Sequence, residues 1–134
     1  MAGYSQTPLS RKLGIADGSV VAFPGAPAEF ATALGKLPES VTVRARAGGS
    51  LDVVVAFFTR RARLEQRLAP LARTIFPAGG LWIAWPKRSS GVATDLTEDI
   101  VRELALAGGL VDNKVCAIDE TWSGLRLVYR LADR

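Results

Sequence analysis

Histidine is absent from the 134-residue sequence, and this absence excludes the commonest kinds of catalytic and metal site. Without an imidazole, the chain cannot build a Ser-His-Asp or Cys-His arrangement for nucleophilic catalysis. The single cysteine, Cys116, cannot hold zinc alone. Carboxylates bind magnesium, but no Asp-rich cluster occurs in the sequence. We therefore predict no metal site, no catalytic residue of these kinds and, on balance, a protein that is not an enzyme.

Disulfides and long hydrophobic runs are missing as well. One cysteine cannot form an intrachain disulfide, which fits a reducing compartment. No apolar run approaches the roughly 18 residues that span a bilayer, and the first residues lack the pattern of a signal peptide. We therefore expect a cytoplasmic protein that makes no membrane contact. The length fits one domain, which we place at residues 16–134 after an N-terminal arm at residues 1–15.

Acidic residues are fewer than basic ones. Lysine and arginine number 17 against 13 aspartates and glutamates, which gives a formal net charge of +4. A solvated surface with some excess charge explains this balance, and a nucleic-acid or other anionic partner is the alternative.

Two unbroken apolar segments flank one amphipathic segment between Leu51 and Arg88. Residues 51–58 and 81–85 have the pattern of strands buried on both faces, and the segment between them places its leucines on one helical face. This is a βαβ unit. We also expect strands and helices at the following positions: strands at 19–23, 41–46, 110–118 and 125–131, and helices at 8–13, at 28–37 and from 94 or 95 to 107.

This order of elements predicts an α/β fold. Strands that alternate with helices favour a mainly parallel sheet with helices on both faces, and the last two strands form an antiparallel hairpin. Only Ala47 to Ser50 separate the strand at 41–46 from the next one, whereas a parallel crossover normally needs about a dozen residues. The strand at 41–46 is therefore very short, or it pairs antiparallel, or its loop passes the sheet edge. We favour a short edge strand.

Three segments in this order resemble the class I methyltransferase fold, the Rossmann-like sheet that binds S-adenosylmethionine (SAM). Residues 51–55 resemble its fourth strand, and residues 71–83 resemble the Leu-x-Pro-Gly-Gly-x-Leu turn into its fifth. The closing hairpin resembles its sixth and seventh strands. The resemblance covers most of the chain from Gly18 onward. It implies a truncated, Rossmann-like, methyltransferase-like three-layer sandwich.

The motifs that hold the cofactor in that family are missing. Its first strand leads into a loop with several glycines, which let the backbone approach the cofactor. Here the loop at residues 23–27 has one glycine, Gly25, and two prolines. The family also has an acidic residue after the second strand, where a carboxylate accepts hydrogen bonds from the ribose hydroxyls. Here Arg44 and Arg46 offer donors only. We therefore predict no cofactor, with SAM as the alternative.

The whole chain also resembles a bacterial group, the domain-of-unknown-function family three-zero-five-two. The residues that carry this resemblance are Met1–Leu9, Trp85–Lys87, Thr94–Asp99 and Thr121–Leu125. The resemblance implies a truncated Rossmann-like fold in a bacterial protein, and it brings no activity with it.

Basic residues collect where the strands of the predicted sheet end. Ligands of open α/β sheets bind outside the carboxyl ends of the strands, and the helix near Ala28 adds a positive dipole end there. We call this candidate site the anion rim. Its members are Gly25, Ala26, Arg44, Arg46, Arg60, Arg61, Lys87 and Arg88. The alternative is a solvated charged edge, because residues 87–91 lack the spacing of a P-loop.

Tryptophan and cysteine positions give two further expectations. Trp82 and Trp85 lie three apart on one strand and therefore face opposite sides of the sheet. Trp122, in the expected loop at 119–124, either folds back over the core or marks a surface for a partner. Cys116 has the apolar setting of an inert core thiol.

These observations favour a non-catalytic ligand-binding or protein-interaction module on a degenerate methyltransferase-like fold. The ligand would be a small anion, and its identity, like that of any protein partner, is not encoded in a recognisable motif. Two alternatives stay open: a SAM-dependent methyltransferase with an atypical cofactor loop, and a weak nucleic-acid binder.

Overall fold

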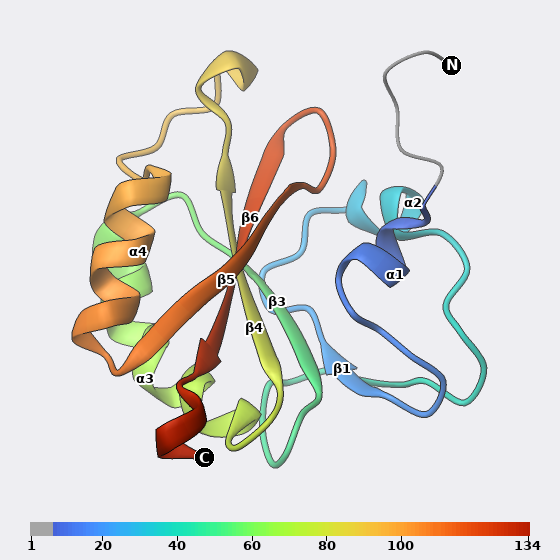
Figure 1. Ribbon diagram of the computed structural model, residues 1–134. Coiled ribbons are helices and arrows are strands. Elements are labelled where there is room, and N and C mark those ends of the chain that lie inside the picture. Colours follow the sequence, from blue (N-terminus) through green and yellow to red (C-terminus); the bar gives the residue numbers. More distant parts are fainter. Residues whose placement is uncertain (1–6) are drawn as a thin grey trace.

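The computed structural model describes residues 7–134, and its centre is one mixed sheet. The strands are β1 (Val20–Ala22), β2 (Thr42–Arg44), β3 (Val53–Phe57), β4 (Gly80–Pro86), β5 (Leu110–Ala117) and β6 (Trp122–Tyr129). They form a six-stranded sheet in the order β2-β1-β3-β4-β6-β5 (Figure 1). The first four strands are parallel, and β6 pairs antiparallel with both β4 and β5. The predicted fold class is confirmed.

Helices cover both faces of the sheet. They are α1 (Leu9–Lys12), α2 (Phe30–Leu34), α3 (Arg61–Ile75) and α4 (Glu98–Ala107), and short 3-10 turns lie at Arg88–Ser90 and Leu131–Asp133. Figure 1 shows α3 and α4 on one side of the sheet and α1 and α2 on the other. One buried cluster lies under each pair of helices, because β3 and β4 are apolar on both faces. Trp85 belongs to the first cluster and Trp82 to the second, as the sequence predicts.

The arm before β1 packs into the second of these clusters. Leu13 is fully buried, and its carbonyl accepts a hydrogen bond of 2.9 Å from the indole Nε1 of Trp82. Lys114 Nζ donates to the carbonyl of Lys12 at 2.9 Å. Residues 1–6, including most of the Met1–Leu9 segment that carries the group resemblance, lie outside the described residues. Within the described part of the chain, no helix is long and apolar enough to cross a membrane.

The starts of α3 and α4 both involve the loop after β4. The amide of Arg61, at the start of α3, donates to Oδ1 of Asp95 at 2.7 Å. Asp95 therefore caps α3 and not the helix that follows it in the sequence. That helix, α4, begins later than expected, and its N-cap is Thr97, whose hydroxyl accepts from the amide of Ile100 at 3.2 Å.

The helix α3 continues through Pro70 as one element from Arg61 to Ile75. The proline therefore neither ends this helix nor begins a second one. The buried residues on either side, Leu68 and Leu71, keep the same face of the helix on the sheet.

The strand β2 is the short edge strand that the sequence favoured. It has three exposed residues and runs parallel to β1. The chain then returns to β3 without a helix, and Ala47 in this linker packs against the cluster under α3 and α4. The preceding helix α2 is also shorter than expected, and it ends at Gly35, whose φ is 70°.

Trp122 is the first residue of β6 and not part of a loop. Oδ1 of Asp119 accepts from the amides of Thr121 and Trp122, both at 2.8 Å, and this shortens the hairpin turn. The Trp122 side chain is 9% exposed, and its ring meets Phe57 edge-on at 5.1 Å. It folds back over the core, which is the first of the two alternatives that the sequence left open, and the structure offers no exposed indole there as an interaction candidate.

Candidate functional site

In the sheet, β1 has β2 as its neighbour in one direction and β3 in the other. The strand order therefore reverses between β1 and β3, and this is the topological switch point. In open α/β sheets, ligands bind in the crevice at the carboxyl ends of these strands. A cavity of 320 Å³ lies there. We call it the switch-point crevice. Its lining residues are Pro24, Gly25, Phe57, Phe58, Thr59, Arg60, Arg63, Arg67 and Leu71.

The loop after β1 is held against the end of β3. The amide of Phe57 donates to the carbonyl of Pro24 at 3.0 Å. Gly25 has a φ of 73°, and a Cβ at this position would lie 3.0 Å from the carbonyl oxygen of Phe57. The single glycine of this loop is therefore required by the chain's own backbone, both for its left-handed conformation and for its close approach to β3.

The charge of the crevice is positive and unbalanced. Arg60, Arg63 and Arg67 line it, and no carboxylate does. Within residues 7–134, none of these three guanidinium groups takes part in an ion pair. Arg63 and Arg67 are one helical turn apart on α3, an arrangement of like charges that weakens an isolated helix slightly. An anion in the crevice would relieve this repulsion.

The members of the anion rim do not form one surface. Gly25 and Arg60 line the switch-point crevice, and Ala26 follows directly in the exposed loop. Arg61 turns away to Glu65, with Nε 3.4 Å from its carboxylate. Arg44 lies at the β2 edge, where its guanidinium donates to the carbonyl of Gly48 at 3.0 Å.

The remaining members lie at the edge strand or beyond β4. Arg46 is exposed in the linker after β2. Lys87 is half-buried, and its Nζ donates to the carbonyl of Asp119. Arg88 lines a separate cavity of 490 Å³, together with residues from Trp85 to Glu98. Lys87 therefore links the β5–β6 turn to the end of β4, and this bond uses one of the three donors of its ammonium group.

Sequence reasoning missed Arg63 and Arg67. Helical periodicity places both off the buried face of α3, which is the usual position of solvated charges. The signal that could have revealed them is the spacing of Arg63, Arg67 and Leu71, because residues four apart form one stripe along a helix. This stripe faces the crevice.

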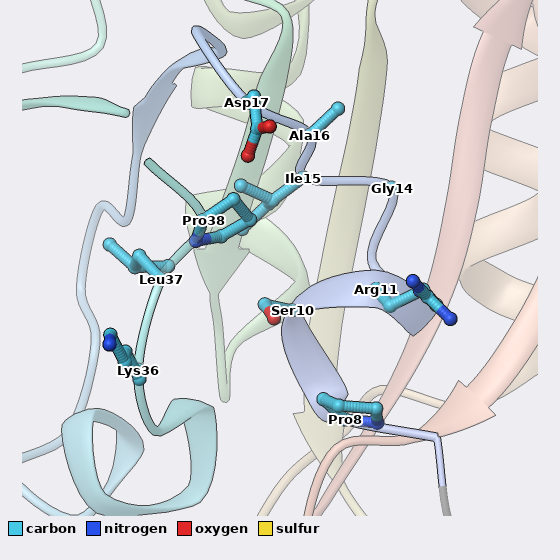
Figure 2. Close-up of a pocket in the computed structure, with 10 residues that line it drawn as sticks. All are labelled: Pro8, Ser10, Arg11, Gly14, Ile15, Ala16, Asp17, Lys36, Leu37 and Pro38. Carbon is cyan, nitrogen blue, oxygen red and sulfur yellow. The ribbon is translucent and has the colours of Figure 1, made fainter. Parts of the chain in front are cut away.

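A larger cavity of 670 Å³ lies at the other edge of the sheet, between α1 and the connection from α2 to β2. Figure 2 shows Ser10 on one side of it and Leu37 and Pro38 on the other, with Lys36 and Arg11 further out. The carboxylate of Asp17 in its wall accepts from the amide of Glu39 at 3.2 Å. This cavity lies at the amino ends of β1 and β2, away from the switch point.

No group of three or more potential metal-binding side chains is found in the part of the chain that the structure covers. Cys116 is half-buried, and burial raises the pKa of its thiol, while the charges of Lys114 and Lys12 lower it by a smaller amount. A thiol with a raised pKa is a weak nucleophile at neutral pH.

No family model matches the sequence, and no curated protein matches it significantly. Solved structures do match its fold. A SAM-dependent methyltransferase from Aquifex aeolicus superimposes with a TM-score of 0.61 at 15% identity, over 87% of this chain and 85% of that one. A putative type 11 methyltransferase from Sulfolobus solfataricus gives 0.59 at 11% identity, over 94% and 92% of the two chains.

Magnesium protoporphyrin IX methyltransferase from Synechocystis, solved with bound SAM, matches with a TM-score of 0.58 at 13% identity, over 91% of this chain and 74% of that one. These matches show that the 134-residue chain itself has a Rossmann-like, methyltransferase-like fold. At these identities the likeness extends to the fold alone. The predicted resemblance to the class I methyltransferase fold is thereby confirmed.

Proposed function

We propose that this protein binds a small phosphorylated ligand, such as a nucleotide, in the switch-point crevice. The observation that carries the proposal is the set of three unpaired arginines in a cavity that contains no carboxylate. Arginine binds phosphate oxygens through paired, charge-assisted hydrogen bonds. Phe58 and Leu71 supply apolar contact beneath the arginines. The volume of 320 Å³ is that of a small ligand site.

The second candidate is a SAM-dependent methyltransferase, and the structural comparisons favour it over a non-catalytic module. Several neighbours with this fold are methyltransferases, and some were solved with SAM or its product SAH. The charge of the crevice favours a phosphorylated ligand instead. SAM carries a positive sulfonium and a net positive charge, which three unpaired arginines disfavour. We therefore derive no methyl-transfer step from these residues.

Membership of the bacterial group three-zero-five-two, and with it a cytoplasmic location, is also a proposal. It is supported by the sequence resemblance of residues 1–9, 85–87, 94–99 and 121–125. Two of these segments meet in the structure, where the amide of Lys87 donates to the carbonyl of Thr121 at 2.7 Å.

Calorimetry and thermal unfolding with AMP, ADP, SAM, SAH and a single-stranded oligonucleotide test these candidates together. A ligand at a hundred times its Kd adds about 2.7 kcal/mol, which raises Tm by several degrees. We expect the nucleotides to stabilise the protein and their affinity to fall with salt. The double variant R63Q/R67Q should bind them about tenfold or more weakly, since each removed guanidinium takes charge-assisted hydrogen bonds with it.

Arg73→Gln is the matched control, because Arg73 lies on the same helix, is exposed and does not line the crevice. The phosphorylated-ligand proposal fails if R63Q/R67Q and R73Q bind nucleotides equally well, or if no nucleotide binds. Stabilisation by SAM and SAH alone would support the methyltransferase. Steeply salt-dependent binding of the oligonucleotide alone would support the nucleic-acid binder.

A further inference from the structure

Arg126 is a half-buried charge without a partner. It lies in β6, and within residues 7–134 its guanidinium makes neither a hydrogen bond nor an ion pair. Burying a charged group is costly unless hydrogen-bond acceptors replace the water that it loses. Arg102 on α4, which is also partly buried, shows the usual solution, because three carboxylates surround it. Arg126 has no such partner.

A cavity of 390 Å³ adjoins this guanidinium at the amino ends of β1, β3 and β4. We call it the Arg126 cavity. It is lined by Gly14, Ser19, residues 50–53, residues 75–79 and Arg126. It therefore lies at the opposite edge of the sheet from the switch-point crevice and shares no lining residue with it.

Glycine at position 80 makes room for the guanidinium. A Cβ there would lie 2.6 Å from Nε and 2.7 Å from Nη2 of Arg126, so the guanidinium rests directly on the Gly80 backbone. Gly79 has a different reason to be glycine, because a Cβ on it would lie 2.7 Å from the carbonyl oxygen of Leu51. Gly80 thus leaves the space that the charged group occupies beside the cavity.

No carboxylate in the lining of the Arg126 cavity neutralises the Arg126 guanidinium, so the guanidinium can bind an anion there. Asp52 also lines the cavity, but Asp52 does not pair with Arg126, and its Oδ2 accepts from the amide of Val20 at 2.8 Å. Arg134 lies near enough to act on Arg126. Burial and, after it, the charge of Arg134 lower the pKa of Arg126. The hydroxyl of Ser50 is exposed at the wall of the cavity and can donate.

We propose that the Arg126 cavity binds a small oxyanion, a carboxylate or a phosphate group, held by the guanidinium of Arg126 and the hydroxyl of Ser50. The site is independent of the switch-point crevice. Bound there, the anion supplies the acceptors that the half-buried guanidinium lacks.

Amide chemical shifts in ¹⁵N-labelled full-length protein, titrated with inorganic phosphate and separately with acetate, test the proposal. We expect saturable shifts at Ser50, Gly79 and Gly80. Binding of both probes assigns the site to oxyanions in general, and binding of only one assigns it to that group. Saturable shifts at Gly25 and Arg60 alone would place phosphate in the switch-point crevice and would overturn the proposal for the Arg126 cavity while leaving the proposed function intact.

Three variants separate a binding role from a structural one. Arg126→Gln removes the charge and should weaken phosphate binding about tenfold or more. Gly80→Ala keeps the charge but pushes the guanidinium from its position, and should weaken binding in the same way. Arg130→Gln, an exposed neighbour on the same segment, should bind as the natural protein does. The proposal is wrong if R126Q and G80A bind phosphate with unchanged affinity, or if the natural protein shows no saturable shift at the cavity.

Discussion

The amide of Arg61 donates a hydrogen bond of 2.7 Å to the carboxylate of Asp95, although the two residues are 34 positions apart. The first turn of α3 thereby receives its cap from the loop that follows β4. Next to this bond, the hydroxyl of Thr94 donates to the carbonyl of Thr59 at 2.7 Å. The two contacts join the end of β3 to the segment after β4, and so fix one wall of the switch-point crevice.

Asp95→Ala should lower the free energy of unfolding by about 1 kcal/mol, the usual cost of removing a helix cap. Urea denaturation measures the change. Glu120→Ala is the matched control, because Glu120 is an exposed acidic residue in a loop and makes no capping contact in the described chain. Equal stability of the two variants would show that the Asp95 cap contributes nothing.

The two glycines before β4 should respond differently to alanine. Gly79→Ala places a Cβ against the carbonyl oxygens of Leu51 and Asp52, at 2.7 and 3.0 Å, which the backbone relieves only by shifting. We expect a loss of about 1–3 kcal/mol in unfolding free energy. Gly80→Ala meets only the movable end of Arg126 and should change stability by about 0.5 kcal/mol or less. The reverse order in thermal or urea unfolding would contradict this account of the turn.

Trp82→Phe should destabilise the protein more than Trp85→Phe. Both residues are buried, but only the indole of Trp82 has a hydrogen bond in the structure as described, to the carbonyl of Leu13. The substitution leaves that buried carbonyl without its donor, so we expect an additional loss of about 1–3 kcal/mol. Urea unfolding followed by far-UV circular dichroism measures both variants. Equal losses would mean that the bond to Leu13 adds no stability.

Thiol modification should report the raised pKa of Cys116. Burial favours the neutral thiol, so the folded protein should react with a thiol-specific reagent at a higher midpoint pH than the same chain in urea. The folded state holds this proton more tightly than the unfolded state. The associated stability is therefore complete below the unfolded-state pKa and is lost as the pH rises through the folded-state pKa. A folded midpoint at or below the unfolded one would refute the assignment.

The central sheet is predictable from the sequence because its signal is local. Residues 53–57 and 80–86 are apolar without interruption, which is typical of strands covered on both faces. The opposite directions of Trp82 and Trp85 follow from strand geometry alone. The same reasoning places the helices α3 and α4 between the strands that they cover.

The features that escape prediction depend on contacts between distant segments. Asp95 has the spacing of a cap for the helix after it, and only the folded chain shows that it caps α3. The polar neighbours of Trp122 predict a loop, and only the folded chain shows that Asp119 tightens the turn and leaves Trp122 in β6. Arg63 and Arg67 have the helical position of solvated charges, and the crevice beside them exists only because the loop at Pro24 and Gly25 closes over β3.

The strand β2 has only β1 as its neighbour, and all three of its residues are exposed. Its amides should therefore exchange with solvent deuterium through local opening, long before those of β3 and β4, whose exchange requires unfolding of the whole sheet. The loop at Pro24 and Gly25 leads directly from β1 towards this weakly held edge. A ligand in the switch-point crevice should accordingly be visible as slower deuterium uptake at Gly25 and at residues 42–44, even where it changes no other part of the structure.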